Sequence, residues 1–123
     1  MSKAMVVDDS QVIRLILRKI LGKLGYEVLE AAHGRQAVAE LERHPEVSLI
    51  LVDWNMPEMN GLEFVKYLRA RPGYSQVTLM MVTTETEIEQ MVTALEAGAN
   101  EYVMKPFTEE IITDKLRLLG LIA

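Results

Sequence analysis

The chain has 123 residues, half of them hydrophobic and a quarter charged, which indicates one globular domain with a single substantial core rather than a disordered segment. No apolar run is long enough to span a bilayer and no signal segment opens the chain, so a cytoplasmic protein without membrane contacts is expected. The absence of cysteine excludes disulfides and thiolate metal sites, and the net charge of −5 argues against nucleic acid as a direct partner.

Short apolar runs alternate with helical patterns through the first half of the chain. Residues 4–7 form an apolar run that ends on Asp8 and Asp9, and Asp9 or Ser10 can cap the helix that follows. Residues 26–30 form a weaker strand with partly alternating polarity, residues 34–43 have helical spacing, and residues 47–52 form a buried strand that ends on Asp53. In the first helix Leu15 is out of phase and is expected to be exposed. The apolar face of that helix is predicted to comprise Val12, Ile13, Ile16, Leu17, Ile20 and Leu24.

The second half continues the same alternation. A third helix opens at Asn60 and Gly61, and residues 76–82 form an apolar strand that ends on Thr83. Residues 87–97 are the clearest helix, because their apolar side chains recur at i, i+3, i+4 and i+7. Residues 102–104 form a short strand ending on Lys105, and Thr108 caps a last helix.

Five strands alternating with five helices predict parallel pairing with right-handed crossovers. The length fits an open, doubly wound sheet and is too short for an eight-stranded barrel. The second strand is amphipathic and the fifth is short, so both suit the edges of the sheet. The order 2-1-3-4-5 meets this condition. We therefore predict an α/β fold with one domain over residues 1–123.

Four of the five strands end in reactive side chains: Asp8 with Asp9, Asp53, Thr83 and Lys105. In the order 2-1-3-4-5 these strand ends share one rim, where ligands of such sheets bind. Three carboxylates there repel one another, and one lysine cannot neutralise them. A divalent cation would neutralise the remaining charge. A site whose ligands are all oxygens, without histidine or cysteine, favours Mg²⁺. Such a site could accept a phosphoryl group, with Asp53 as the nucleophile of an aspartyl phosphate.

Each of these residues has an ordinary interpretation when taken alone. Asp8 and Asp9 are good helix caps, Asp53 could begin a turn, Thr83 could be a capping hydroxyl, and Lys105 could lie in a solvated loop. Their coincidence at one rim favours a functional site. His33 and His44 lie near helix ends and are not expected to be ligands.

Five blocks of the sequence resemble the receiver domains of two-component response regulators, above all the stand-alone receivers of chemotaxis, which have this flavodoxin-like strand order. The blocks are Val6-Val7-Asp8-Asp9-Ser10, Asp53-Trp54-Asn55-Met56-Pro57 with Asn60-Gly61, Val82-Thr83-Thr84, Ala97-Gly98-Ala99, and Lys105-Pro106-Phe107. The resemblance covers the whole chain, and the blocks occur in the order of that family.

The resemblance implies a role for each site residue. Asp53 would be the phosphoacceptor, and Mg²⁺ would be held by Asp9, Asp53 and the backbone carbonyl of Asn55, with Asp8 acting through a water molecule. Lys105 would pair with the phosphoryl oxygens. Thr83 would move toward them, and Tyr102 would be the switch aromatic that turns inward with it. Asn55 and Glu85 match positions that tune loss of the phosphoryl group, and Lys105-Pro106 matches a bond that is usually cis.

The resemblance also implies partners. A histidine kinase or phosphotransfer protein would supply the phosphoryl group. A downstream protein would bind the face formed by the helix at 87–97, the strand at 102–104 and the last helix. We expect a monomeric signalling switch without an output domain, which catalyses only its own phosphorylation and dephosphorylation. A chemotaxis role is favoured, and an intermediate receiver of a phosphorelay is the alternative.

Two other classes fit less well. Phosphatases of the haloacid dehalogenase family carry Asp-x-Asp after the first strand, whereas the acids here are adjacent and the best nucleophile follows the third strand. A flavin carrier would need a phosphate-binding loop where this chain has acids. Two features depart from the receiver pattern: Thr84 replaces a small residue beside Thr83, and the helix at 87–97 has glutamates and no lysine.

Overall fold

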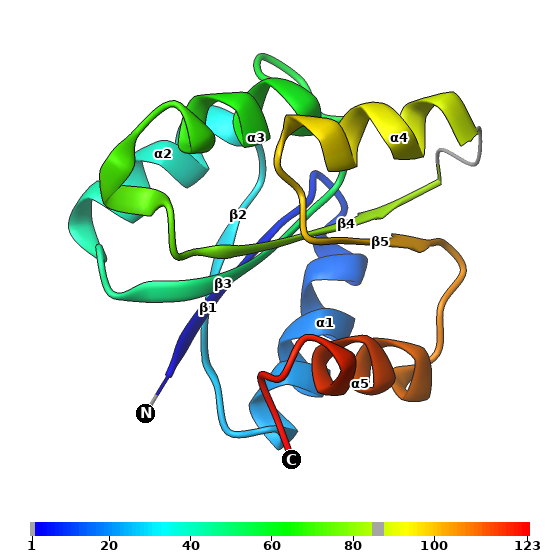
Figure 1. Ribbon diagram of the computed structural model, residues 1–123. Helices are drawn as coiled ribbons and strands as arrows, with labels where there is room; N and C mark the ends of the chain where they lie inside the picture. Colours follow the sequence, from blue (N-terminus) through cyan, green and yellow to red (C-terminus); the bar gives the residue numbers. More distant parts are fainter. Residues whose placement is uncertain (1, 85–87) are drawn as a thin grey trace.

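The computed structural model describes residues 2–84 and 88–123, and it contains a five-stranded sheet with helices on both faces (Figure 1). The strand order is β2-β1-β3-β4-β5 with every pair parallel, which confirms the predicted fold class. The strands are β1 (Lys3–Val7), β2 (Glu27–Ala31), β3 (Val47–Val52), β4 (Thr78–Thr83) and β5 (Glu101–Met104). The helices are α1 (Gln11–Lys23), α2 (Gly34–Arg43), α3 (Gly61–Arg69), η1 (Pro72–Tyr74), α4 (Ile88–Ala97) and α5 (Glu109–Leu118).

The sheet separates two apolar cores. Helices α2, α3 and α4 cover one face and helices α1 and α5 cover the other (Figure 1). Because successive side chains of a strand point to opposite faces, β3 divides its apolar residues between the cores. Ile50 and Val52 pack on the α2–α3–α4 side, whereas Leu49 and Leu51 pack on the α1–α5 side. This two-sided burial is why β3 is apolar at nearly every position.

Side-chain caps fix where three of the helices begin. Ser10 accepts a hydrogen bond from the Ile13 amide at the start of α1, and Thr108 accepts one from the Ile111 amide at the start of α5. Asn60 and Glu63 form a reciprocal capping box at the start of α3. All three caps lie at the rim where the strands end, so they also set the course of the loops there.

The predicted elements differ from the observed ones in detail. Strand β4 begins two residues later than expected and includes Thr83. Leu15 is exposed, as predicted, but the assignment of Val12 and Ile16 to the buried face of α1 was wrong. They are 66% and 41% exposed, because the sheet covers only the stripe centred on Leu17, Ile20 and Leu21.

Helix α4 turns much of its apolar face to solvent. Ala94 is its one fully buried residue, and Met91 and Ala97 pack against the same core. Ile88, Val92 and Leu95 are 76%, 45% and 43% exposed. The apolar spacing correctly predicted a helix, but its exposed side is more apolar than a solvated helix requires.

Within residues 2–84 and 88–123, no helix has both the length and the apolar character needed to cross a bilayer.

Candidate functional site

Asp8 and Asp53 lie side by side because the strands that carry them are neighbours in the sheet. Val7 of β1 and Val52 of β3 are register partners, and each is followed directly by an aspartate. The Asp53 amide donates to the Val7 carbonyl at 2.9 Å and the Asp8 amide donates to the Ala31 carbonyl at 3.1 Å. These backbone hydrogen bonds continue the sheet one residue further and hold both aspartates at its carboxyl edge.

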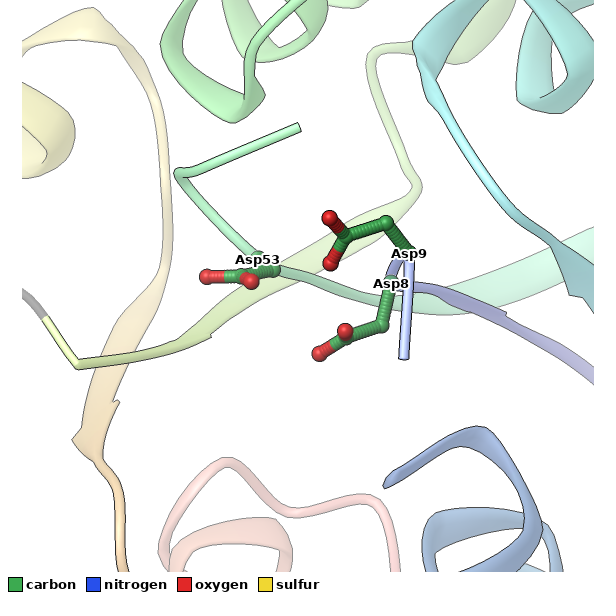
Figure 2. A group of neighbouring side chains, drawn as sticks. All are labelled: Asp8, Asp9 and Asp53. Carbon is green, nitrogen blue, oxygen red and sulfur yellow. The ribbon is translucent and has the colours of Figure 1, made fainter. Parts of the chain in front are cut away.

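Asp9 completes a group of three carboxylates. One oxygen from each of Asp8, Asp9 and Asp53 lies within 4.8 Å of the other two. Figure 2 shows the three side chains projecting to the same side, beyond the ends of the strands. Asp8 and Asp53 are 1% and 6% exposed, whereas Asp9 is exposed, so the group is open to solvent on the Asp9 side.

Lys105 brings a positive charge to the two buried carboxylates from the end of β5. Its Nζ lies 2.7 Å from Asp8 Oδ2 and 3.4 Å from Asp53 Oδ2. Its backbone amide donates to the Thr83 carbonyl at 2.8 Å, which ties the β5–α5 loop to the end of β4. The bond from Lys105 to Pro106 is cis, as the resemblance implies. Residues from three separate strands therefore meet as expected.

The donor set fits a hard divalent cation. The three carboxylates and one ammonium sum to two negative charges, which one Mg²⁺ would balance. All the candidate ligand atoms are oxygens, as Mg²⁺ prefers, and the open side leaves room for the water molecules that this ion usually keeps. The residues present are therefore compatible with Mg²⁺.

Backbone amides and a guanidinium orient the two buried aspartates. The Ser10 amide donates to Asp8 Oδ1 at 2.8 Å, and the Asn55 amide lies 3.4 Å from Asp53 Oδ1. Arg14 donates to the Asp8 carbonyl at 2.6 Å and forms an ion pair with Glu30 of β2 at 3.1 Å. Arg14 was not among the residues predicted for the site, because only the paired strands bring Glu30 to it.

Gly61 lets the start of α3 approach the backbone of Asp53. A Cβ at this position would overlap the Asp53 carbonyl oxygen and lie 2.9 Å from Trp54 Cα. The Gly61 amide donates to the Trp54 carbonyl at 2.9 Å across the same contact. Any larger residue would have to displace the backbone that carries the candidate nucleophile.

Comparison with known proteins identifies the family. A family model described as "Response regulator receiver domain" matches residues 4–117. The chain belongs to this receiver family. The similar proteins include "Chemotaxis protein CheY1" of Helicobacter pylori, which is 44% identical over 118 residues that span 95% of each chain. They also include "Chemotaxis protein CheY homolog" of Campylobacter jejuni, 47% identical over 93% of this chain and 88% of the relative.

Solved structures give the same result. The chemotaxis protein CheY4 of Vibrio cholerae is similar with a TM-score of 0.88 and 38% identity, over 96% of this chain and 98% of that one. The suspected resemblance to chemotaxis receivers is therefore confirmed for both sequence and fold. The phosphoryl chemistry assigned to individual residues remains a prediction.

The receiver's other candidate residues lie at or next to the same rim. Thr83 is fully buried at the end of β4, and Tyr102 is 5% exposed in the core beneath α4. Tyr102 is therefore buried in this structure, and its role as a switch stays a prediction. Asn55 is exposed in the loop after Asp53. Glu85, the second expected tuning residue, lies outside the described residues.

Proposed function

We propose that this receiver is a phosphorylation-activated signalling switch of the chemotaxis type, with Asp53 as phosphoacceptor. The observation that carries the proposal is the meeting of Asp53 with two further carboxylates and Lys105 at one edge of the sheet. A buried carboxylate with a lysine at 3.4 Å is suited to attack an electrophilic phosphorus atom.

Each side chain has a definite part in the transfer. An Asp53 carboxylate oxygen forms a bond to phosphorus, and the bond from phosphorus to the donor breaks, so that the donor keeps its electron pair. Lys105, already between Asp8 and Asp53, would pair with an oxygen of the arriving group. The buried Thr83 hydroxyl would donate to another. Asp8, Asp9, Asp53 and the Asn55 carbonyl would hold Mg²⁺, which supplies positive charge to the phosphoryl oxygens.

The signal would leave through the face formed by α4, β5 and α5. Large apolar side chains are exposed on all three elements: Ile88, Val92, Leu95, Met104, Ile111 and Leu118. Glu89 adds negative charge at the start of α4, and that helix has no lysine. An apolar surface with acidic character suits a downstream protein with a basic rim around an apolar groove.

The phosphoryl donor would be a histidine kinase or a phosphotransfer protein, docked beside the rim on α1. Leu15 is 49% exposed on this helix, Val12 extends the apolar surface toward the site, and Ile16 extends it along the helix. Replacement Leu15→Glu is expected to slow transfer from the donor protein and to leave labelling by a small phosphodonor unchanged. Equal rates for wild type and variant with the donor protein would exclude this docking surface.

A role as a phosphorelay intermediate is the second candidate, since it needs the same site. The two differ in the fate of the phosphoryl group. A relay receiver passes it to a second histidine protein, whereas a chemotaxis receiver loses it to water. The similarity to chemotaxis proteins favours the second fate. Incubating the phosphorylated receiver with histidine phosphotransfer proteins and following the label distinguishes them.

Labelling by acetyl phosphate tests the proposal. In Mg²⁺, wild-type protein is expected to gain one phosphoryl group by intact mass, and Asp53→Asn is expected to gain none. Asp114→Asn is the matched control, because this exposed aspartate lies in the second half of α5, where it forms an ion pair with Arg117 at 3.0 Å. Full labelling of Asp53→Asn would refute the assignment of the phosphoacceptor.

A further inference from the structure

The start of α2 contacts the loop that follows the candidate phosphoacceptor. This loop, residues 53–60, connects β3 to α3 and is called here the β3–α3 loop. Gly34, the first residue of α2, is buried against it. A Cβ on Gly34 would lie 2.8 Å from both Cβ and Cγ of Met59. The two segments are therefore packed so closely that only glycine fits between them.

His33 adds a polar contact at the same place. As the N-cap of α2, its Nδ1 accepts a hydrogen bond from the Gln36 amide at 3.2 Å. The neutral ring then carries its hydrogen on Nε2. That atom lies 3.2 Å from Glu58 Oε2 in the β3–α3 loop. The ring thus caps its own helix with one nitrogen and can donate to the loop with the other.

Glu58 has a backbone conformation that needs such support. Its φ is +67°, and it is the one non-glycine residue with a positive φ among the described residues. Residues that carry a Cβ disfavour this region of backbone conformation, so an unrestrained loop would tend to leave it. A contact from outside the loop opposes that tendency.

The segment that carries His33 also touches the other half of the acidic site. The Ala31 carbonyl, at the end of β2, accepts a hydrogen bond from the Asp8 amide at 3.1 Å. Residues 31–34 therefore contact the backbone of Asp8 on one side and the β3–α3 loop on the other. This segment is placed to fix how the two parts of the site lie relative to each other.

We infer that His33 is a positioning residue: through Glu58 it holds the β3–α3 loop in the conformation in which Asp53 and the Asn55 carbonyl can bind a divalent cation. The inference rests on the proposed function, since it concerns the same cation site. It gives a role to two residues outside that site. The contact orders the loop before the cation arrives, so that less of the binding free energy is spent on ordering it.

Three variants separate the loop contact from the helix cap and from stability. His33→Asn keeps a capping side chain but is too short to reach Glu58. Glu58→Ala removes the contact and keeps the unfavourable positive φ. In the double variant His33→Asp with Glu58→Lys, the aspartate still caps α2, and the lysine can donate to its second carboxylate oxygen, so a contact between α2 and the loop is restored with the donor on the loop. Glu42→Gln, on the exposed side of α2, controls for the loss of one negative charge.

The first measurement is hydrogen exchange of the Asn55 and Met59 amides in metal-free protein. Both amides have acceptors within the loop. Faster exchange is expected in His33→Asn and Glu58→Ala, and wild-type exchange in the double variant. Unchanged exchange in both single variants would overturn the inference, whatever the behaviour toward the metal.

The second measurement is Mg²⁺ affinity from the emission of Trp54, which adjoins Asp53. Each single variant is expected to bind Mg²⁺ roughly two- to fivefold more weakly, the effect of losing a partly exposed pair, and the double variant to recover. Each single variant should melt within a few degrees of the wild-type temperature in chelator, because a partly exposed pair contributes only about 0–1 kcal/mol, so its weaker binding cannot reflect lost stability. Single variants that bind like wild type would refute the positioning role. Absence of any Mg²⁺ response in wild type would instead refute the proposed function.

Discussion

Removing the charge of Asp9 should stabilise the metal-free protein while weakening its response to Mg²⁺. Asp9 is exposed, and one of its oxygens lies within 4.8 Å of oxygens of both Asp8 and Asp53. Without a cation it contributes repulsion to the folded state. With a cation it becomes a ligand. The replacement Asp9→Asn keeps the shape of the side chain and should therefore change these two quantities in opposite directions.

The size of the effect follows from the spacing of the carboxylates. Two unit charges 4.8 Å apart interact with about 3.5 kcal/mol at an effective dielectric constant near 20 and about 0.9 kcal/mol in bulk water. Asp9 meets two carboxylates, and Lys105 offsets about one of them. Because Asp9 is exposed and salt screens it, the lower half of this range applies. We expect Asp9→Asn to raise the free energy of unfolding by about 1–2 kcal/mol without metal.

Urea unfolding followed by the emission of Trp54 measures both quantities. The wild type and Asp9→Asn are compared in chelator and in a series of Mg²⁺ concentrations, since a ligand that binds only the folded state stabilises it by mass action. The variant should need on the order of tenfold more Mg²⁺ than the wild type for the same increase in the free energy of unfolding. Glu42→Gln, on the exposed side of α2, removes one negative charge away from the rim and serves as control.

Three results would contradict this reasoning. A loss of stability in chelator would mean that Asp9 is held by favourable contacts rather than opposed by its neighbours. An unchanged Mg²⁺ dependence would mean that Asp9 is not among the ligands. The same increase in the free energy of unfolding in Glu42→Gln would mean that the effect comes from the net charge of the protein alone.

Three further changes test how the site is supported. Lys105→Met leaves two buried carboxylates without their counter-charge and should lower the free energy of urea unfolding in chelator by about 3 kcal/mol, part of which Mg²⁺ should restore. An unchanged free energy of unfolding would exclude the ion pairs. Gly61→Ala should lower the free energy of unfolding by about 1–3 kcal/mol and slow labelling by acetyl phosphate, because its Cβ displaces the Asp53 carbonyl. Normal labelling would show that the loop adapts. Arg69→Met loses hydrogen bonds to carbonyls including that of Gly98 and should lower the free energy of urea unfolding by about 2–3 kcal/mol while the Mg²⁺ affinity stays the same. Weakened Mg²⁺ binding would show that these hydrogen bonds also support the acidic site.

Much of the fold was predictable because local patterns and global topology agree. The apolar run of β3, the amphipathic β2 and the short β5 each fit one position in the sheet, and the observed order confirms this. The orientation of the helices was less predictable. In α1 and α4 the apolar residues spread over more of the surface than the sheet covers, so spacing alone could not decide that Val12 and Ile88 face solvent.

The meeting of Asp8, Asp53 and Lys105 was also predictable, because the ends of neighbouring parallel strands converge whatever the loops do. The supporting contacts were not. Arg14 meets Glu30 and His33 meets Glu58 across segments distant in sequence, and each residue type is common at helix ends and in loops. Only the packed structure shows which of these side chains come together.

The central claim is that Asp53 itself receives the phosphoryl group, and chemical trapping tests it most directly. Borohydride reduces an acyl phosphate to an alcohol, which converts a phosphorylated aspartate into homoserine. After acetyl phosphate and Mg²⁺ treatment, peptide mass analysis is predicted to find homoserine at position 53 and intact aspartate at positions 8 and 9. Homoserine at Asp8 or Asp9, or at none of the three, would contradict the account.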